Sequence, residues 1–191
     1  VHDGESGESK SVGLMSGGER VFVNECLIRA VALYLHAKGH QRLGVVGGDD
    51  ERACRRSEAF QAAARTLGLP PVPEVRVPTP TTLQRGRDGL ARLLALQPDV
   101  EAVFCSSDLL ALGVMTEARV RGLAVPGQLA VVGFGDLEFA AALEPALTTV
   151  HIKGAAIGRQ AAQFIVDRAE GRDVPQRVVD IGFAIVERLS A

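Results

Sequence analysis

The sequence predicts an α/β fold in which helices cover both faces of a mainly parallel sheet. Short apolar runs alternate with longer segments whose apolar residues recur at helical spacing. The short runs are apolar at almost every position, which is typical of strands that are buried on both faces of a parallel sheet. Ligands of such sheets bind beyond the carboxyl ends of the strands, so polar residues at those ends are the first candidates for a site.

The expected elements follow one another in a regular order. Asn24 is expected to cap a helix that ends at Gly39, and Thr81 or Thr82 to cap a later one. Residues 1–19 are rich in Gly, Ser and acidic side chains, so no regular element is expected there. The predicted strands are 21–23, 43–46, 74–77, 102–105, 129–132 and 148–152, and the predicted helices after the first are 52–67, 83–94, 109–121, 137–143 and 155–169. Two short runs, 177–181 and 184–186, predict a terminal hairpin or bent strand around Gly182.

Composition excludes several classes of protein. Of 191 residues, 47% are hydrophobic and 23% charged, which is typical of globular proteins. A net charge of -2 gives no general attraction to nucleic acid or anionic lipid, and no apolar run approaches the length needed to span a bilayer. Three cysteines, Cys26, Cys54 and Cys105, predict buried free thiols in a reducing compartment rather than a disulfide framework.

Several segments, in order and at matching separations, resemble the effector domain of the lactose/galactose repressor family. The similarity covers residues 21–190, and the segment GFGDLEFAAALEPALTTVHI is similar to the gluconate-operon repressor branch. The other segments that carry the resemblance are LHAKGHQRLGVVGG, ERACRRSEAFQAAARTLGL, VEAVFCSSDLLALGVMTEARVRGLAVPGQLAVVGFGD and IGRQAAQFIVDRAEG.

The resemblance implies a fold like that of the type I periplasmic binding proteins, with two lobes that each hold a parallel sheet flanked by helices. It assigns residues 1–40 and 153–173 to an N-terminal lobe that is truncated here, and residues 41–152 and 174–191 to the C-terminal lobe. Crossings between the lobes are expected near Gln41, His151 and Val174. The family's helix-turn-helix head and hinge helix are expected to lie outside this chain.

The family's ligands present hydroxyl and carboxylate groups, which call for a cation with a planar fork and for small polar side chains. By the resemblance, Arg56 occupies the position of the family's effector-binding arginine, and Arg52 precedes it on the same helix. Ser107 stands where many members carry a ligand-binding Asn, and Asp108 is the acidic residue that follows. The spacing of these residues allows a purely structural interpretation as well. Arg56 would then be a solvated helix residue. Ser106, Ser107 and Asp108 would cap the next helix.

The strand 129–132 is followed by a second candidate segment. Phe134 and Asp136 are the predicted effector-binding residues there, with Asp136 replacing an Asp that relatives carry at the position of Gly135. Gly133-x-Gly135 is not a dinucleotide fingerprint, because Glu138 stands in place of the third glycine.

No catalytic, cofactor or metal site is predicted. His36 and His40 are four residues apart, but Gly39 ends the helix between them, so helix capping is favoured over metal binding. Serine and cysteine residues have no neighbouring His in the sequence, which leaves no nucleophile and base to assign.

The predicted function is therefore effector sensing by a cytoplasmic bacterial transcription repressor. A sugar or sugar acid is expected to bind between the lobes and to alter operator binding by the missing head, without any membrane association. A homodimer is expected through the helices that start near Leu109 and Leu137. The alternative is a periplasmic sugar-binding protein of a transport system, which shares the two-lobed core.

Overall fold

The computed structural model describes residues 28–172, 179 and 182–191. The predicted strand 21–23, the cap at Asn24, Cys26 and nearly all of the run 177–181 lie outside the described residues, as does the predicted crossing near Val174.

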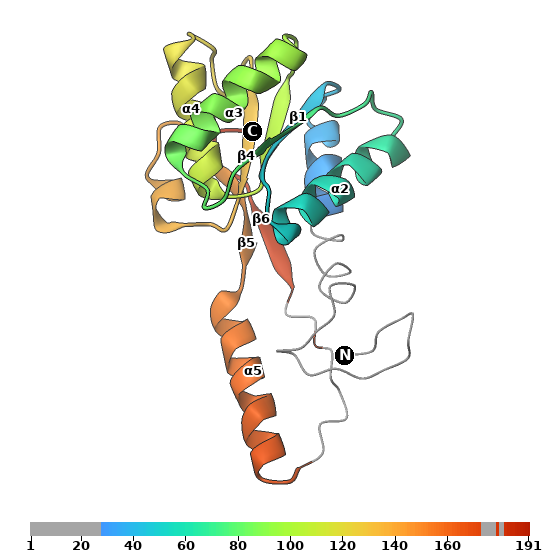
Figure 1. The fold of residues 1–191 in the computed structure, drawn as a ribbon, viewed down its shortest axis with the longest axis vertical. Coiled ribbons are helices and arrows are strands. Elements are labelled where there is room, and N and C mark those ends of the chain that lie inside the picture. Colours follow the sequence, from blue (N-terminus) through green and yellow to red (C-terminus); the bar gives the residue numbers. More distant parts are fainter. Residues whose placement is uncertain (1–27, 173–178, 180–181) are drawn as a thin grey trace.

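The described strands form one six-stranded sheet in the order β2-β1-β3-β4-β5-β6 (Figure 1). The first five strands run parallel, as the apolar runs predict, and β6 pairs antiparallel with β5 through the register Val150↔Ile185. The sheet is therefore mixed, and its last strand returns along β5. The bounds are β1 Leu43–Gly48, β2 Glu74–Val77, β3 Ala102–Cys105, β4 Ala130–Phe134, β5 Thr148–Ile152 and β6 Phe183–Val186.

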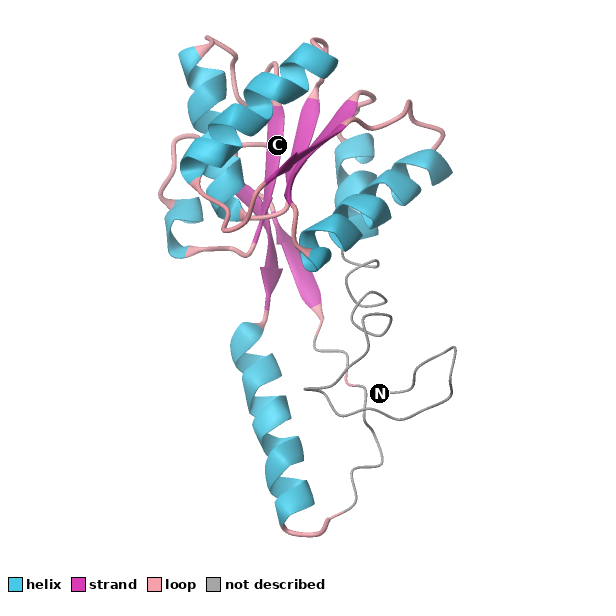
Figure 2. Cartoon of the chain, viewed as in Figure 1, coloured by secondary structure: helices cyan, strands magenta, loops and turns pink. Residues whose placement is uncertain are grey.

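The helices alternate with the strands (Figure 2). Asp50 caps α2 by accepting hydrogen bonds from the backbone N–H groups of Arg52 and Ala53, and Thr82 caps α3 by accepting one from Arg85. A first described helix spans residues 28–37 and ends before Gly39, which has a φ of 97°. The labelled helices are α2 Glu51–Thr66, α3 Leu83–Leu96, α4 Asp108–Val120 and α5 Gly154–Ala169.

The predicted helix over 137–143 is wrong in extent: only a 3-10 turn, η2 Glu138–Ala141, forms there. Pro145 disfavours helical backbone at Glu144, and Ala140 is the only buried residue of the turn, so little packing supports a longer helix.

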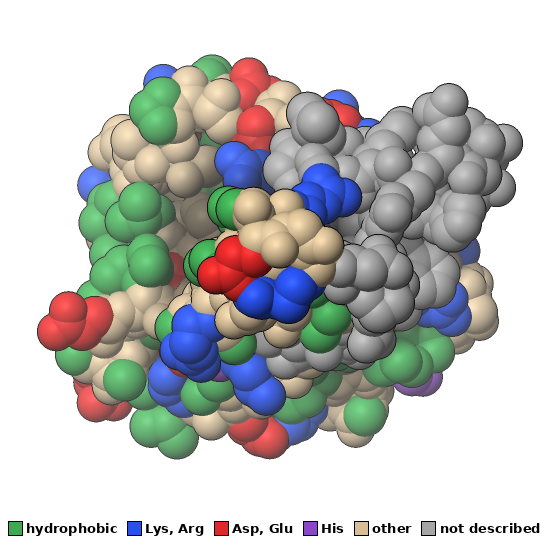
Figure 3. Space-filling view, turned by 90° about the horizontal axis from the view of Figure 1, so that it is seen from below, with side chains coloured by type: hydrophobic (Ala, Val, Ile, Leu, Met, Phe, Trp, Pro, Cys, Tyr) green, Lys and Arg blue, Asp and Glu red, His purple; other side chains and the backbone are tan. Residues whose placement is uncertain are grey.

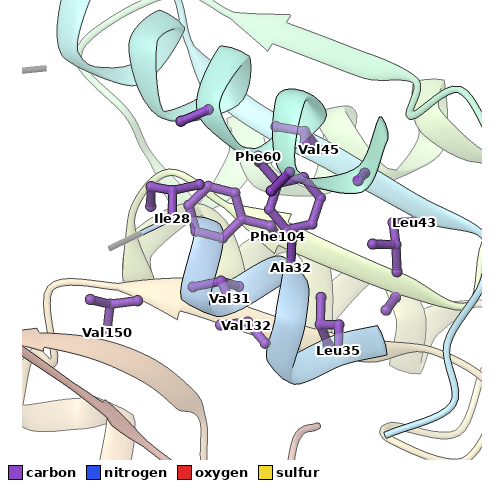
Figure 4. Close-up of a cluster of buried hydrophobic side chains, with 14 of the residues drawn as sticks. Ile28, Val31, Ala32, Leu35, Leu43, Val45, Phe60, Phe104, Val132 and Val150 are labelled. Carbon is purple, nitrogen blue, oxygen red and sulfur yellow. The ribbon is translucent and has the colours of Figure 1, made fainter. Parts of the chain in front are cut away.

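Side chains of alternate strand residues divide the core into two layers. On one face the helix 28–37 and α2 cover Leu43, Val45, Phe104 and Val132, and the rings of Phe60 and Phe104 stack with centroids 5.2 Å apart (Figure 4). On the other face α3 and α4 cover a second cluster. Its members include Val46, Val103, Val131, Leu90, Leu93, Leu110 and Leu147. Both faces of the parallel strands are thus buried, as predicted.

Helix α5 differs from the others because none of its residues is buried. It continues from β5 and projects away from the sheet (Figure 1), and apolar residues such as Ile165 remain exposed. Figure 3 views the molecule from this side and shows charged side chains at the free end of the helix, where Arg172 pairs with Asp167 and Glu170.

Helices α3 and α4 cross at two glycines. A Cβ on Gly113 would lie 2.1 Å from the carbonyl oxygen of Leu83 and 2.7 Å from the Cα of Gly86, both of which are backbone atoms. The backbones therefore approach as closely as they do only because neither position carries a side chain.

We expect Gly113→Ala to lower the free energy of unfolding by about 1–3 kcal/mol, because one of the two helices has to move away. Chemical denaturation measures this change. The matched control is Gly158→Ala on α5, where nothing lies within 4 Å of the new Cβ and helix propensity favours alanine. Equal stability of Gly113→Ala and the native protein would show that the crossing is not tight.

Candidate effector site at the carboxyl edge of the sheet

Strands β1, β2, β3 and β4 end at the same edge of the sheet because they are parallel. The segments that follow them carry the polar residues of the candidate site. They are Asp49 and Asp50 after β1, Thr79 to Thr81 after β2, Ser106 to Asp108 after β3, and Gly135 and Asp136 after β4.

Arg56 reaches this edge from the second turn of α2. Its Nη1 donates a hydrogen bond of 3.0 Å to the carbonyl oxygen of Ser106, and its guanidinium carbon lies 3.7 Å from the centre of the Phe134 ring. Its Nε is buried and finds no hydrogen-bond partner among the described residues. Two of the predicted effector-binding residues, Arg56 and Phe134, are thus in direct contact.

Burial lowers the pKa of Arg56 to about 10, an effect that Asp50 opposes and Arg52 reinforces. The guanidinium stays charged at neutral pH, so a cation with an unused donor is held where water solvates it poorly. An anionic or strongly accepting ligand group would satisfy that donor. Arg52 itself is exposed on the first turn of α2 and acts on Arg56 only through its charge.

Ser107 joins two loops of the edge. It is the N-cap of α4, where its Oγ accepts from the backbone N–H of Leu110 at 3.3 Å, and the same hydroxyl lies 3.3 Å from Oγ1 of Thr81 after β2. Its neighbour Ser106 accepts a hydrogen bond from the N–H of Gly48. The serines therefore fix the ends of β1, β2 and β3 relative to one another.

Asp108 does not cap α4, so that interpretation of its sequence position is wrong. It is the first residue of the helix and is fully buried. Its Oδ1 accepts from the hydroxyl of Thr149 at 2.6 Å, and its Oδ2 accepts from the N–H of Leu137 at 2.7 Å. Burial raises its pKa. The buried side chain has no exposed surface for a ligand, and its hydrogen bonds hold the loop after β4 against β5.

The carboxylate of Asp136 pairs with His151 and Arg188 rather than with Arg56. Gly135 and Asp136 both have positive φ, 133° and 52°, and only glycine adopts the first without strain. The Asp136 carboxylate consequently lies over β5, where Oδ2 is 2.9 Å from Nδ1 of His151 and Oδ1 accepts from Nη2 of Arg188 at 2.7 Å.

Sequence reasoning did not place Arg188 in the site, and it placed His151 in a segment that crosses between the lobes. Arg188 follows β6 and reaches Asp136 only because that strand returns antiparallel along β5. No local motif signals this approach. The cap at Asp50 was also missed, although an Asp before a helical run is a typical capping signal.

Other types of site find no support within the described part of the chain. No group of three or more His, Cys, Asp or Glu residues there is arranged to hold a metal ion. No helix among these residues is long and apolar enough to cross a membrane. Cys105 is a buried free thiol, as predicted, and Cys54 is a half-buried one.

The fold agrees with comparisons to known proteins. Residues 32–191 match the family described as the periplasmic binding protein-like domain. The chain belongs to this family, which confirms the predicted fold class.

Curated proteins with similar sequences are transcriptional regulators. It is 37% identical over 163 residues to the HTH-type transcriptional regulator GntR of Pseudomonas aeruginosa, which covers 84% of this chain and 48% of the relative. It is 33% identical over 143 residues to the transcriptional repressor CytR of Escherichia coli, covering 74% of this chain and 42% of the relative. The chain spans about half the length of these curated relatives.

Solved structures with a similar fold are also transcriptional regulators. The transcription regulator GntR from Chromobacterium violaceum is 35% identical with a TM-score of 0.82, and the match covers 88% of this chain and 63% of that one. A LacI family regulator from Silicibacter pomeroyi is 29% identical with a TM-score of 0.79, covering 87% and 62%. Within its family, the chain is an effector-binding domain of the LacI type of transcriptional regulator, as the sequence resemblance predicted.

We expect Asp108→Ala to lower the free energy of unfolding by about 2–4 kcal/mol, because it leaves the part-buried N–H of Leu137 and the buried hydroxyl of Thr149 without their acceptor. Chemical denaturation tests this. Asp88→Ala on the exposed face of α3 is the control and should change stability by less than about 0.5 kcal/mol. Similar effects of the two substitutions would refute the organising role of Asp108.

Proposed function

We propose that this chain is the effector-sensing core of a bacterial transcription repressor, which binds a sugar or sugar acid at the carboxyl edge of the sheet. One observation carries the proposal: the guanidinium of Arg56 lies over the Phe134 ring, and its Nε has no hydrogen-bond partner among the described residues. A ligand oxygen that accepts from Nε would complete its hydrogen bonding. A cytoplasmic location follows from this role.

The comparisons support this choice of function. The cited sequence relatives are named as HTH-type transcriptional regulators, which favours a repressor over a transport protein and over an enzyme. A solved structure of the regulator CelR in complex with cellobiose is 28% identical to the chain with a TM-score of 0.78. That regulator binds a sugar on the same fold, and we extend the ligand class to this chain.

The proposed mechanism is a shift between two relative orientations of two lobes. Residues 41–152 and 174–191 would form one lobe, and residues 1–40 and 153–173 would belong to the other, which the rest of a longer protein would complete. The exposed apolar side chains of α5 would then be covered by that second lobe. A ligand that contacts both lobes more favourably in one orientation would change the presentation of a DNA-binding head.

We expect Arg56→Ala to weaken effector binding at least about a hundredfold without loss of secondary structure, because it removes the buried guanidinium whose Nε has no protein partner among the described residues. Isothermal titration calorimetry of the intact protein against sugars and sugar acids measures the affinity. Arg65→Ala, at the exposed end of the same helix, is the control and should bind normally. Undiminished affinity in the Arg56 variant would remove the observation on which the proposal rests.

The homodimer is a second proposal, which exposed leucines favour. Leu109 and Leu137 are 37% and 44% exposed, and they lie near each other because Asp108, the neighbour of Leu109, binds the backbone of Leu137. Leu83, at the start of α3, is also 37% exposed. Large apolar side chains grouped at a surface are typical of subunit contacts.

We expect Leu109→Glu to weaken dimerisation at least about tenfold, because it places an unpaired charge in the contact. Sedimentation equilibrium of the intact protein gives the dissociation constant. Leu96→Glu, at the far end of α3 where the side chain is 66% exposed, should leave it unchanged. A Leu109 variant that dimerises like the native protein would place the contact elsewhere.

A further inference from the structure

The carboxylates near the candidate site are already engaged by the protein itself. Asp49 accepts from the N–H of Thr79, and Asp50 accepts from the first N–H groups of α2. Asp108 is buried between Thr149 and Leu137. The nearby charge of Asp50 is opposed by that of Arg52, since the two shift the pKa of Arg56 in opposite directions.

The position of the Asp136 carboxylate determines whether an unpaired negative charge lies at the carboxyl edge of the sheet. It lies two residues after Phe134, the ring that carries the Arg56 guanidinium. Its side chain is only 17% exposed and is held by two groups, Arg188 with an 18% exposed side chain and His151 with a 42% exposed one. Arg188 also donates to the carbonyl oxygen of Leu147, so its guanidinium is fixed at both ends.

This arrangement has an electrostatic consequence. A free carboxylate beside Phe134 would compete with a ligand for the charge of Arg56, and it would repel any anionic ligand group. The ion pair with Arg188 neutralises that charge, and the positive φ of Gly135 and Asp136 turns the carboxylate toward β5. Asp136 therefore pairs with His151 and Arg188 rather than with Arg56, whose buried Nε has no hydrogen-bond partner among the described residues.

We propose that Arg188 and His151 are specificity-determining residues, which sequester Asp136 so that the site selects an effector bearing an anionic group over its neutral counterpart. This inference rests on the proposed function and adds the charge class of the ligand. Both residues act through Asp136 and are therefore positioning residues. The anion is a carboxylate or a phosphate, since both accept from a guanidinium in the same way.

A double-mutant cycle on the intact protein tests the inference. The probes for calorimetry are D-gluconate, its neutral counterpart D-glucitol and D-glucose 6-phosphate, with further sugar acids and their matching polyols. Arg188→Met frees the Asp136 charge and should reduce the ratio of anion to polyol affinity roughly fivefold to tenfold. Asp136→Asn in the Arg188→Met background should restore the ratio, and Arg188→Lys should retain it.

The control is Arg76→Met, which breaks an exposed ion pair with Glu74 on β2 and should leave the ratio unchanged. Restoration by Asp136→Asn is a readout that a merely structural role of Arg188 would not produce. If Arg188→Met does not fold, the native protein alone can still overturn the inference, by binding the polyol as tightly as the matching sugar acid.

The outcomes separate the two proposals. Tighter binding of gluconate than of glucitol, with the loss and restoration described, supports the inference for a carboxylate, and the same pattern for glucose 6-phosphate supports it for a phosphate. Equal or tighter binding of polyols overturns the inference and leaves the proposed function standing. Failure of every sugar, polyol and acid to bind would overturn both.

Discussion

The proposed function of this domain depends on the contact between the Arg56 guanidinium and the Phe134 ring. A buried cation is costly unless other groups hold it, and here an aromatic face and one carbonyl oxygen do so while Nε stays unused. The same contact joins α2, which follows β1, to the end of β4. It exists only if both elements are held rigidly.

Two features of the sheet provide that rigidity. The stacked rings of Phe60 and Phe104 fix α2 on the sheet, since Phe60 lies one turn beyond Arg56. The buried carboxylate of Asp108 holds the loop that follows Phe134 by binding Leu137 and Thr149. The edge is thus assembled from the packing of the core on one face and from a satisfied polar network on the other.

Much of the fold followed from the sequence because its signals are local. The alternation of apolar runs and helical periodicity placed β1 to β5 and α2 to α5 close to their observed bounds, and Gly39 and Thr82 ended and began helices as expected. The antiparallel course of β6 did not follow, because strand direction depends on long-range pairing. The short η2 turn did not follow either, because apolar spacing at 137–143 says nothing about how little of it is buried.

The site shows the same division. The family resemblance identified Arg56, Ser107 and Phe134 as candidate site residues, and the structure brings Arg56 and Phe134 into contact. The partners of Asp136 depend on two positive φ values and on a segment more than fifty residues away, neither of which is visible in residue spacing. Sequence reasoning identified the carboxylate but could not show which way it points.

The central claim is that the unused Nε–H of Arg56 donates to the effector. The most direct test is a two-dimensional NMR titration of the intact protein with labelled arginine side chains, observing the Nε–Hε resonances. The account predicts that saturation with a bound sugar or sugar acid shifts the Arg56 resonance and protects it from solvent exchange, while that of Arg65 does not change. A ligand that binds with calorimetric saturation and leaves the Arg56 resonance unmoved would contradict it.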